Sequence, residues 1–191
     1  MASAIATAAA AAVLRATAEP VIKHIAGALK IGADKARANF TDAFKNHLEL
    51  TYTRCANVRT IFTGERFVPL SSIYVNLRLS SGNKTCRDED LVLNCDKLGN
   101  TVVIGTGGAG KTMLMRHVAL LLYEKPVGKI PLFVELRNIP KHDPKDFYKT
   151  IFNMITPERR ADQFSIFLEG LRSGLFVLLL DGLDEVKPTD R

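Results

Sequence analysis

The stretch GTGGAGKT, residues 105–112, decides the fold of this 191-residue chain. It matches the phosphate-loop pattern G-x-x-x-x-G-K-[ST] at every fixed position. Glycine lets the backbone bring its N–H groups close to phosphate oxygens, where a Cβ atom would interfere. We expect Lys111 to contact the β and γ phosphates and the Thr112 hydroxyl to bind Mg²⁺. The predicted phosphate-binding residues are Gly105, Thr106, Gly107, Gly108, Ala109, Gly110, Lys111 and Thr112.

The segments on either side of this loop have the patterns that a phosphate loop requires. Residues 101–105 (TVVIG) read as a short apolar strand, and residues 111–123 as a helix with apolar residues at helical spacing. The helix would present unsatisfied N–H groups and the positive end of its dipole to the same anion. The sequence therefore predicts a binding site for a nucleoside triphosphate.

The rest of the C-terminal half alternates between strand and helix patterns. Two more strands are expected at 131–136 and 175–180, and two helices at 144–155 and 161–172. Residues 175–180 are continuously apolar, as expected of a strand covered on both faces. This order predicts an α/β fold: a three-layer P-loop NTPase with a parallel sheet.

Acidic residues follow the last of these strands. Asp181 would lie at the carboxyl end of a buried parallel strand, where such sheets bind ligands. It is predicted to hold Mg²⁺, usually through water. Asp184 and Glu185 come just after it, and one of them could orient or deprotonate a water molecule that attacks the γ-phosphate. Glu185 is slightly favoured for that role.

The string LFVLLLDGLDEV at 175–186 resembles the second nucleotide motif of NACHT domains. VVIGTGGAGKTMLMRHVA and IPLFVELR also look like that family, whereas the GTGGAGKT loop leans slightly toward the related NB-ARC loop. The resemblance covers about Asn100–Lys187. It implies a STAND-class signalling ATPase, of the kind found in inflammasome-type receptors and in bacterial anti-phage defence. It further implies ATP and Mg²⁺ as cofactors, nucleotide-gated switching and a homo-oligomer in the full-length form.

The same resemblance implies that the sheet is incomplete at the C-terminus. In the STAND architecture another strand, later in sequence, separates the phosphate-loop strand from the strand ending at Asp181. None is evident before Arg191, and we expect the chain to be an N-terminal fragment. The isolated chain would then be poorly soluble or partly molten. The resemblance implies hydrolysis by the full-length protein and leaves open whether this piece alone hydrolyses ATP.

Residues 1–90 are predicted to form a mainly helical region with one strand near 72–80, where apolar and polar residues alternate. An apolar stripe between Asn39 and Phe62 is explained by core packing. The polar stretch 80–90 reads as a loop, so we divide the chain into regions 1–90 and 91–191. No catalytic effector is evident in the first region, because the four histidines are dispersed.

Composition limits the remaining functions. The net charge is +6, but the basic residues are scattered, which does not favour nucleic-acid binding. Three cysteines without C-x-x-C spacing fit a reducing compartment. The alanine-rich residues 1–18 read as a helix rather than a signal peptide or membrane span, so a cytoplasmic location is expected.

Three functional hypotheses follow. The leading one is an ATP-driven signalling switch. The alternative is a non-catalytic nucleotide-binding scaffold or adaptor that acts through the N-terminal helices. A weaker third is a metabolic P-loop enzyme such as a small kinase, for which no acceptor site is evident. The trigger, the effector and the choice between ATP and GTP stay open.

Overall fold

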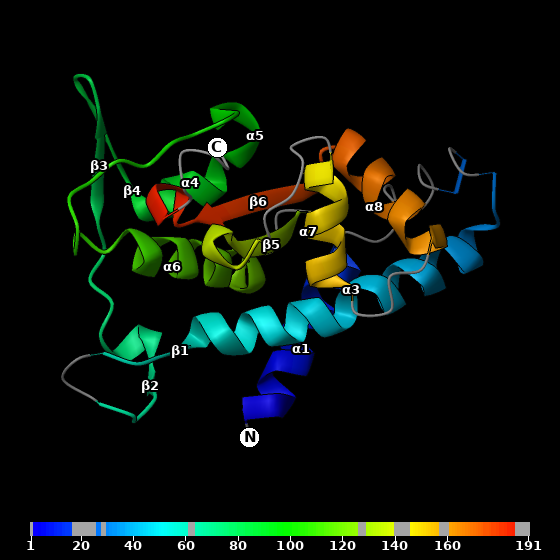
Figure 1. Cartoon of the computed structure of the whole chain (residues 1–191), viewed down its shortest axis with the longest axis horizontal. Coiled ribbons are helices and arrows are strands. Elements are labelled where there is room, and N and C mark those ends of the chain that lie inside the picture. The colour runs from blue at the N-terminus through cyan, green and yellow to red at the C-terminus, as the bar shows by residue number, and fades with distance from the viewer. Residues whose placement is uncertain are drawn as a thin grey trace.

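A computed structural model describes residues 2–16, 26–27, 30–60, 64–125, 129–139, 146–156 and 161–185. At its centre, β5 (Ile130–Glu135) pairs in parallel with β6 (Phe176–Asp181) (Figure 1). The register runs from Ile130 opposite Phe176 to Glu135 opposite Asp181. Both strands therefore end at the same edge of the sheet, and each ends in a carboxylate residue.

Helices surround this strand pair where the sequence periodicity predicted them. In the C-terminal half they are α6 (Lys111–Glu124), α7 (Phe147–Ile155) and α8 (Ala161–Arg172). In the N-terminal half they are α1 (Ala2–Ala16) and α3 (Ala33–Ala56). Two short helices, α4 (Asp88–Leu93) and α5 (Cys95–Leu98), precede the phosphate loop. No helix in the described ranges is long and apolar enough to cross a membrane.

Alternate residues of β5 pack against different helices, which gives three layers. Phe133 belongs to one core cluster together with Leu114 and Val118 of α6. Leu132 and its neighbours two residues away belong to a second cluster, formed with α1, α3, α7 and α8. Successive side chains of a strand point to opposite faces, so each face has its own helical layer. The predicted α/β class with a parallel sheet is confirmed.

The apolar stripe of α3 is buried in the same core as the sheet. Phe40, Phe44 and Leu48 have almost no exposed surface, and they share a cluster with Leu132 and Phe152. The prediction that core packing explains this stripe is confirmed. The helical N-terminal region and the C-terminal half thus share one hydrophobic core.

The predicted strand at 72–80 is only partly present. A short 3₁₀ helix occupies Leu70–Ser72, and β3 (Arg78–Ser81) pairs with β4 (Lys84–Arg87) as an antiparallel hairpin. Ile73 and Val75, expected on the buried face, are exposed. The reason is Tyr74, whose ring stacks on His117 of α6 and turns its apolar neighbours outward. The hairpin also occupies the predicted polar loop; the division of the chain near residue 90 stays a prediction.

The predicted strand at 101–105 is absent from the structure. Val102 is 73% exposed and Ile104 90% exposed, and only Val103 packs against the core. A strand requires a neighbour to pair its backbone groups, and among the described residues β6 pairs with β5 alone. For the same reason β6 is less buried than its apolar sequence predicted, whereas every residue of β5 is buried. Two further strands, β1 (Asn57–Val58) and β2 (Val68–Pro69), form a small separate antiparallel pair.

Candidate functional site

The phosphate loop turns directly into the first turn of α6. Gly108 and Gly110 have positive φ angles of 78° and 87°, and α6 begins at Lys111. Residues with a Cβ rarely adopt such angles, so glycine is required where the chain enters the helix. The free N–H groups of this helix start face the loop, which makes the junction suitable for an anion.

The side chain of Lys111 folds back onto this loop. Its Nζ atom donates hydrogen bonds to the carbonyl oxygens of Gly105, at 2.9 Å, and Thr106, at 3.2 Å. The N–H of Ala109 donates to the same Thr106 carbonyl, which closes a turn inside the loop. An ammonium group is therefore held against the loop, where its charge is available to phosphate oxygens.

The two sequence motifs meet at Thr112 and Asp181. The Thr112 hydroxyl donates a hydrogen bond of 3.1 Å to Oδ1 of Asp181, although 69 positions separate the two residues. Thr112 lies in the first turn of α6, and Asp181 is the last residue of β6. The fold thus brings together the predicted phosphate loop and the predicted acidic strand end.

This pair has the donor chemistry that Mg²⁺ prefers. A hydroxyl oxygen and a carboxylate oxygen are hard ligands, and Mg²⁺ takes only one or two protein ligands besides phosphate and water. In the described part of the chain, no group of three or more His, Cys, Asp or Glu side chains could hold a metal by itself. Thr112 and Asp181 therefore fit a metal ion that is bound jointly with a triphosphate.

Asp184 and Glu185 follow Asp181 in a short 3₁₀ turn, Leu183–Glu185. Gly182, with φ of 80°, turns the chain out of the strand, and the N–H of Glu185 donates to the carbonyl of Gly182 at 3.1 Å. Both acidic side chains are exposed at the same edge of the sheet as Asp181. Their position is compatible with a role at the attacking water, and that role stays a prediction.

Sequence reasoning missed the buried carboxylate of Glu135 at the end of β5. It is 8% exposed, and three arginines surround it: Arg54, Arg116 and Arg137. The amide of Asn138 also donates to Oε2 of Glu135 at 2.9 Å. The only sequence signal was an acid ending an apolar strand, the same signal that identified Asp181. The arginine partners could not be found in this way, because they come from separate elements.

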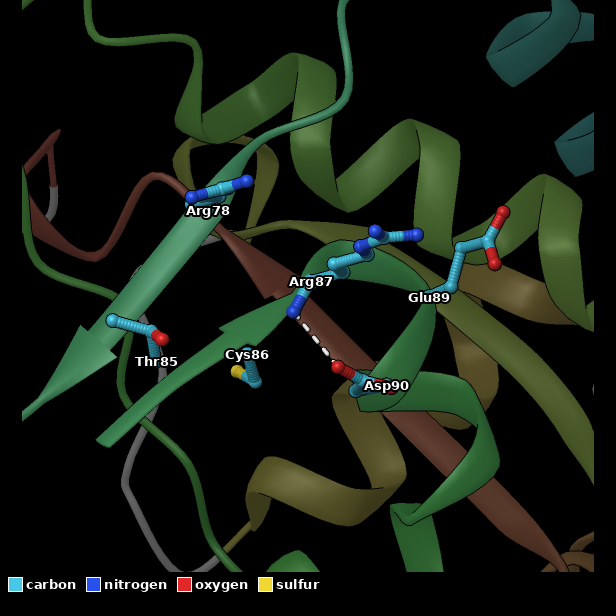
Figure 2. A pocket seen from close by; sticks show the side chains of 6 residues that line it. All are labelled: Arg78, Thr85, Cys86, Arg87, Glu89 and Asp90. Carbon is cyan, nitrogen blue, oxygen red and sulfur yellow. Dashed lines mark hydrogen bonds between the residues drawn. The ribbon is translucent and has the colours of Figure 1, made fainter.

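A separate hollow lies beside the β3–β4 hairpin (Figure 2). It has a volume of about 520 Å³, and its lining residues are Arg78, Thr85, Cys86, Arg87, Glu89 and Asp90. Figure 2 shows the hydrogen bond from the backbone N–H of Arg87 to the Asp90 carboxylate, which is 2.8 Å long. None of its lining residues belongs to the phosphate loop or to the acidic strand end. The predicted nucleotide site and this hollow are thus formed by different residues.

Comparison with known families agrees with this geometry. Residues 100–191 match the family model of the NACHT domain. This part of the chain is similar to the NACHT domain. NACHT domains are nucleotide-binding P-loop NTPases of the STAND class, and they generally bind nucleotide together with Mg²⁺. Comparisons with curated proteins and with solved structures gave no match.

The NACHT match begins at Asn100, just before the phosphate loop, and includes Asp181 and Glu185. It therefore covers both motifs that the Thr112–Asp181 hydrogen bond joins. Arg116, Glu135 and Arg137 also lie inside the NACHT segment. Arg54, on α3, lies outside it.

Proposed function

We propose that this protein is an ATP-binding and ATP-hydrolysing signal-transduction switch of the NACHT type. The observation that carries this proposal is the hydrogen bond between Thr112 and Asp181. It joins the phosphate loop to the acidic strand end, the two parts that a Mg²⁺–triphosphate site needs. An immune or anti-phage role, assembly into a homo-oligomer and a cytoplasmic location are part of the same proposal and rest on the family resemblance.

Binding depends on charge and on backbone groups of the loop. The N–H groups at the start of α6 would donate to the phosphates. Lys111 would exchange its bonds to the carbonyls of Gly105 and Thr106 for bonds to phosphate oxygens. Mg²⁺, held through Thr112 and Asp181, would neutralise charge on the β and γ phosphates.

Hydrolysis would require a carboxylate beside the attacking water. Glu185 is the first candidate, and Asp184 is the second, because both follow Asp181 at the carboxyl edge of the sheet. A carboxylate in that position could orient the water and accept its proton. In the switch we propose, the ATP-bound form assembles, and hydrolysis or exchange resets it.

The first experiment is a titration of the purified chain with a fluorescent ATP analogue in the presence of Mg²⁺. Replacing Lys111 with Ala removes a charge-assisted bond worth about 1.5–3 kcal/mol, or about 10- to 150-fold in affinity. Lys45→Ala, which removes an exposed lysine of α3, should leave affinity unchanged. Equal affinity of Lys111→Ala and wild type would contradict the proposed site.

The second experiment measures phosphate release and separates the switch from the alternative scaffold. A switch releases phosphate, and Glu185→Gln slows the release while the dissociation constant stays the same. Binding of Mg²⁺–ATP without any release of phosphate would favour the scaffold. If Glu185→Gln has no effect, the same assay on Asp184→Asn tests the second candidate.

Burial of α3 counts against a scaffold that binds partners through the apolar face of this helix. The apolar face of α3 is buried against β5, α7 and α8, so it is not available to a partner. A scaffold would have to use other surfaces of the N-terminal helices.

A further inference from the structure

The ion pairs around Glu135 form a path from α3 to Glu185. Arg54 of α3 and Arg137 both approach Oε2 of Glu135, through their Nη2 atoms at 3.2 Å and 3.4 Å. Arg116 of α6 approaches Oε1 at 3.6 Å. The other terminal nitrogen of Arg137, Nη1, lies 3.8 Å from Oε2 of Glu185. One guanidinium group therefore connects a buried carboxylate to the carboxylate that we propose acts on water.

Glu135 has more donors than it needs. A buried carboxylate must be paired, but two arginines and the Asn138 amide would still satisfy it without Arg137. Three cations thus lie around one carboxylate, and one of them, Arg137, also faces Glu185. While Arg54 is in place, Arg137 is thus the partner that Glu135 needs least, because loss of Arg137 would leave no buried charge unpaired.

The contact between Arg137 and Glu185 is weak by comparison. The two side chains are 55% and 52% exposed, and their closest atoms are 3.8 Å apart. Exposed ion pairs of this kind contribute little to stability and break readily. Glu185 is held toward Leu136–Asn138, the short turn that follows β5, by a contact that can open at little cost.

We propose that Arg137 is a positioning residue that restrains Glu185 while the site is at rest, and that Arg54 of α3 controls this restraint through Glu135. A carboxylate held toward a guanidinium is not free to turn toward a water molecule in the site. When α3 withdraws Arg54, Arg137 moves closer to Glu135 and releases Glu185. This inference rests on the proposed role of Glu185, and it gives the N-terminal region a function in controlling hydrolysis.

The test compares wild type with Arg137→Gln, Arg137→Lys, Glu185→Gln and the double variant Arg137→Gln/Glu185→Gln. Arg172→Gln is the control, because Arg172 is also an exposed arginine that forms an ion pair, with Glu169 at 3.4 Å. Each protein is measured for the dissociation constant of Mg²⁺–ATP, the rate of phosphate release in a single turnover, and backbone hydrogen exchange of residues 182–185 without nucleotide.

Arg137→Gln should raise the rate of phosphate release by about two- to fivefold, the range expected from losing one exposed ion pair, while the dissociation constant stays the same. Arg137→Lys, which keeps the charge, should stay close to wild type. The double variant should match Glu185→Gln, because Arg137 acts through Glu185. The backbone hydrogen-exchange rate of residues 182–185 should be higher than wild type in Arg137→Gln and equal to wild type in Arg172→Gln.

A second pair of variants tests the connection to α3. Arg54→Gln should raise phosphate release in the same direction as Arg137→Gln but less, whereas Lys45→Gln on the same helix should not. An unchanged rate for Arg54→Gln would overturn the control by α3.

The outcomes separate this inference from the proposed function. If the wild-type protein does not bind Mg²⁺–ATP, the proposed function is contradicted. With binding intact, an equal or lower rate for Arg137→Gln, or an effect that persists in the Glu185→Gln background, would overturn the restraint alone. If no variant releases phosphate, the hydrogen exchange of residues 182–185 decides, and unchanged exchange in Arg137→Gln overturns the inference.

Discussion

The hydroxyl of Thr112 and the carboxylate of Asp181 are joined by a hydrogen bond of 3.1 Å between the start of α6 and the end of β6. The bond connects the start of a helix to the end of a strand. It therefore keeps the two oxygen atoms that would bind Mg²⁺ close together before any ligand arrives. A preorganised pair of this kind loses little conformational entropy when a ligand binds.

Thr112→Val should remove the Mg²⁺ dependence of ATP binding. Valine has nearly the shape of threonine but no hydroxyl, so the helix should form normally. We expect affinity in the presence of Mg²⁺ to fall at least about tenfold, which corresponds to about 1.4 kcal/mol, and affinity in EDTA to stay unchanged. Titration with a fluorescent ATP analogue under both conditions measures this. Thr112→Ser, which keeps the hydroxyl, is the control, and an equal loss in both variants would contradict the metal role.

Asp88→Asn should destabilise the fold. Asp88 is fully buried and accepts hydrogen bonds from the Tyr74 hydroxyl, at 2.7 Å, and from the N–H groups of Leu77 and Glu89. Although burial favours the neutral form, these bonds together lower the pKa of Asp88. We expect Asp88→Asn to lower the free energy of unfolding by about 1–3 kcal/mol at pH 7. Urea unfolding measures it, and Tyr74→Phe, which removes one donor, should cost less.

The sign of the pH dependence at Asp88 follows from the direction of its pKa shift. Because the native pKa lies below the unfolded value of about 3.9, the stabilisation is complete above that pH. It is lost as the pH falls through the native pKa. The difference between wild type and Asp88→Asn should therefore shrink in acid, and a difference that stays constant from pH 7 to pH 2 would contradict it.

Stability should also fall between pH 6.5 and pH 4 because of His47. Burial, together with the nearby charge of Arg54, lowers the pKa of His47 to about 4. The unfolded chain binds a proton at about pH 6.5, so protonation favours unfolding below that pH, with a total effect of roughly 2–4 kcal/mol. His47→Gln should flatten the pH dependence of urea unfolding in this range. The same slope in both proteins would show that His47 is not buried in its neutral form.

Replacing Val102 and Ile104 with Thr should reduce self-association of the chain. Both side chains project from an unpaired segment, and β6 has a second edge that pairs with no described strand. Exposed apolar residues near an open sheet edge promote association between chains. Light scattering at fixed concentration should decrease for the double variant. The control is Val75→Thr, which removes an equally exposed valine far from that edge in sequence; an equal decrease there would contradict the explanation.

The helices were predicted well because their signals are local. Phe40, Phe44 and Leu48 show a helical spacing that burial then confirmed. The segment 101–105 has an equally clear strand pattern, yet it is not a strand, because a strand depends on a neighbour that the pattern does not specify. The alternating pattern of 72–80 predicted a strand wrongly for a related reason. Tyr74 contacts His117 of α6 and Asp88 of α4, and the pattern does not specify these contacts.

The residues of the candidate site also differ in whether a local sequence signal identifies them. The phosphate loop and Asp181 could be predicted, because residue type and spacing encode their chemistry. Glu135 and its arginines could not, because Arg54, Arg116 and Arg137 are brought together only by the packing of α3 and α6 on β5.

The two bonds that Lys111 donates to its own loop have a kinetic consequence. In this conformation the carbonyl oxygens of Gly105 and Thr106 accept the bonds that phosphate oxygens would accept from the ammonium group, and the curvature of the loop already exists. An arriving phosphate therefore trades places with two carbonyl oxygens and does not have to shape disordered backbone. The association rate of nucleotide should accordingly be high and limited by diffusion. Differences in affinity among nucleotides should appear mainly in their dissociation rates.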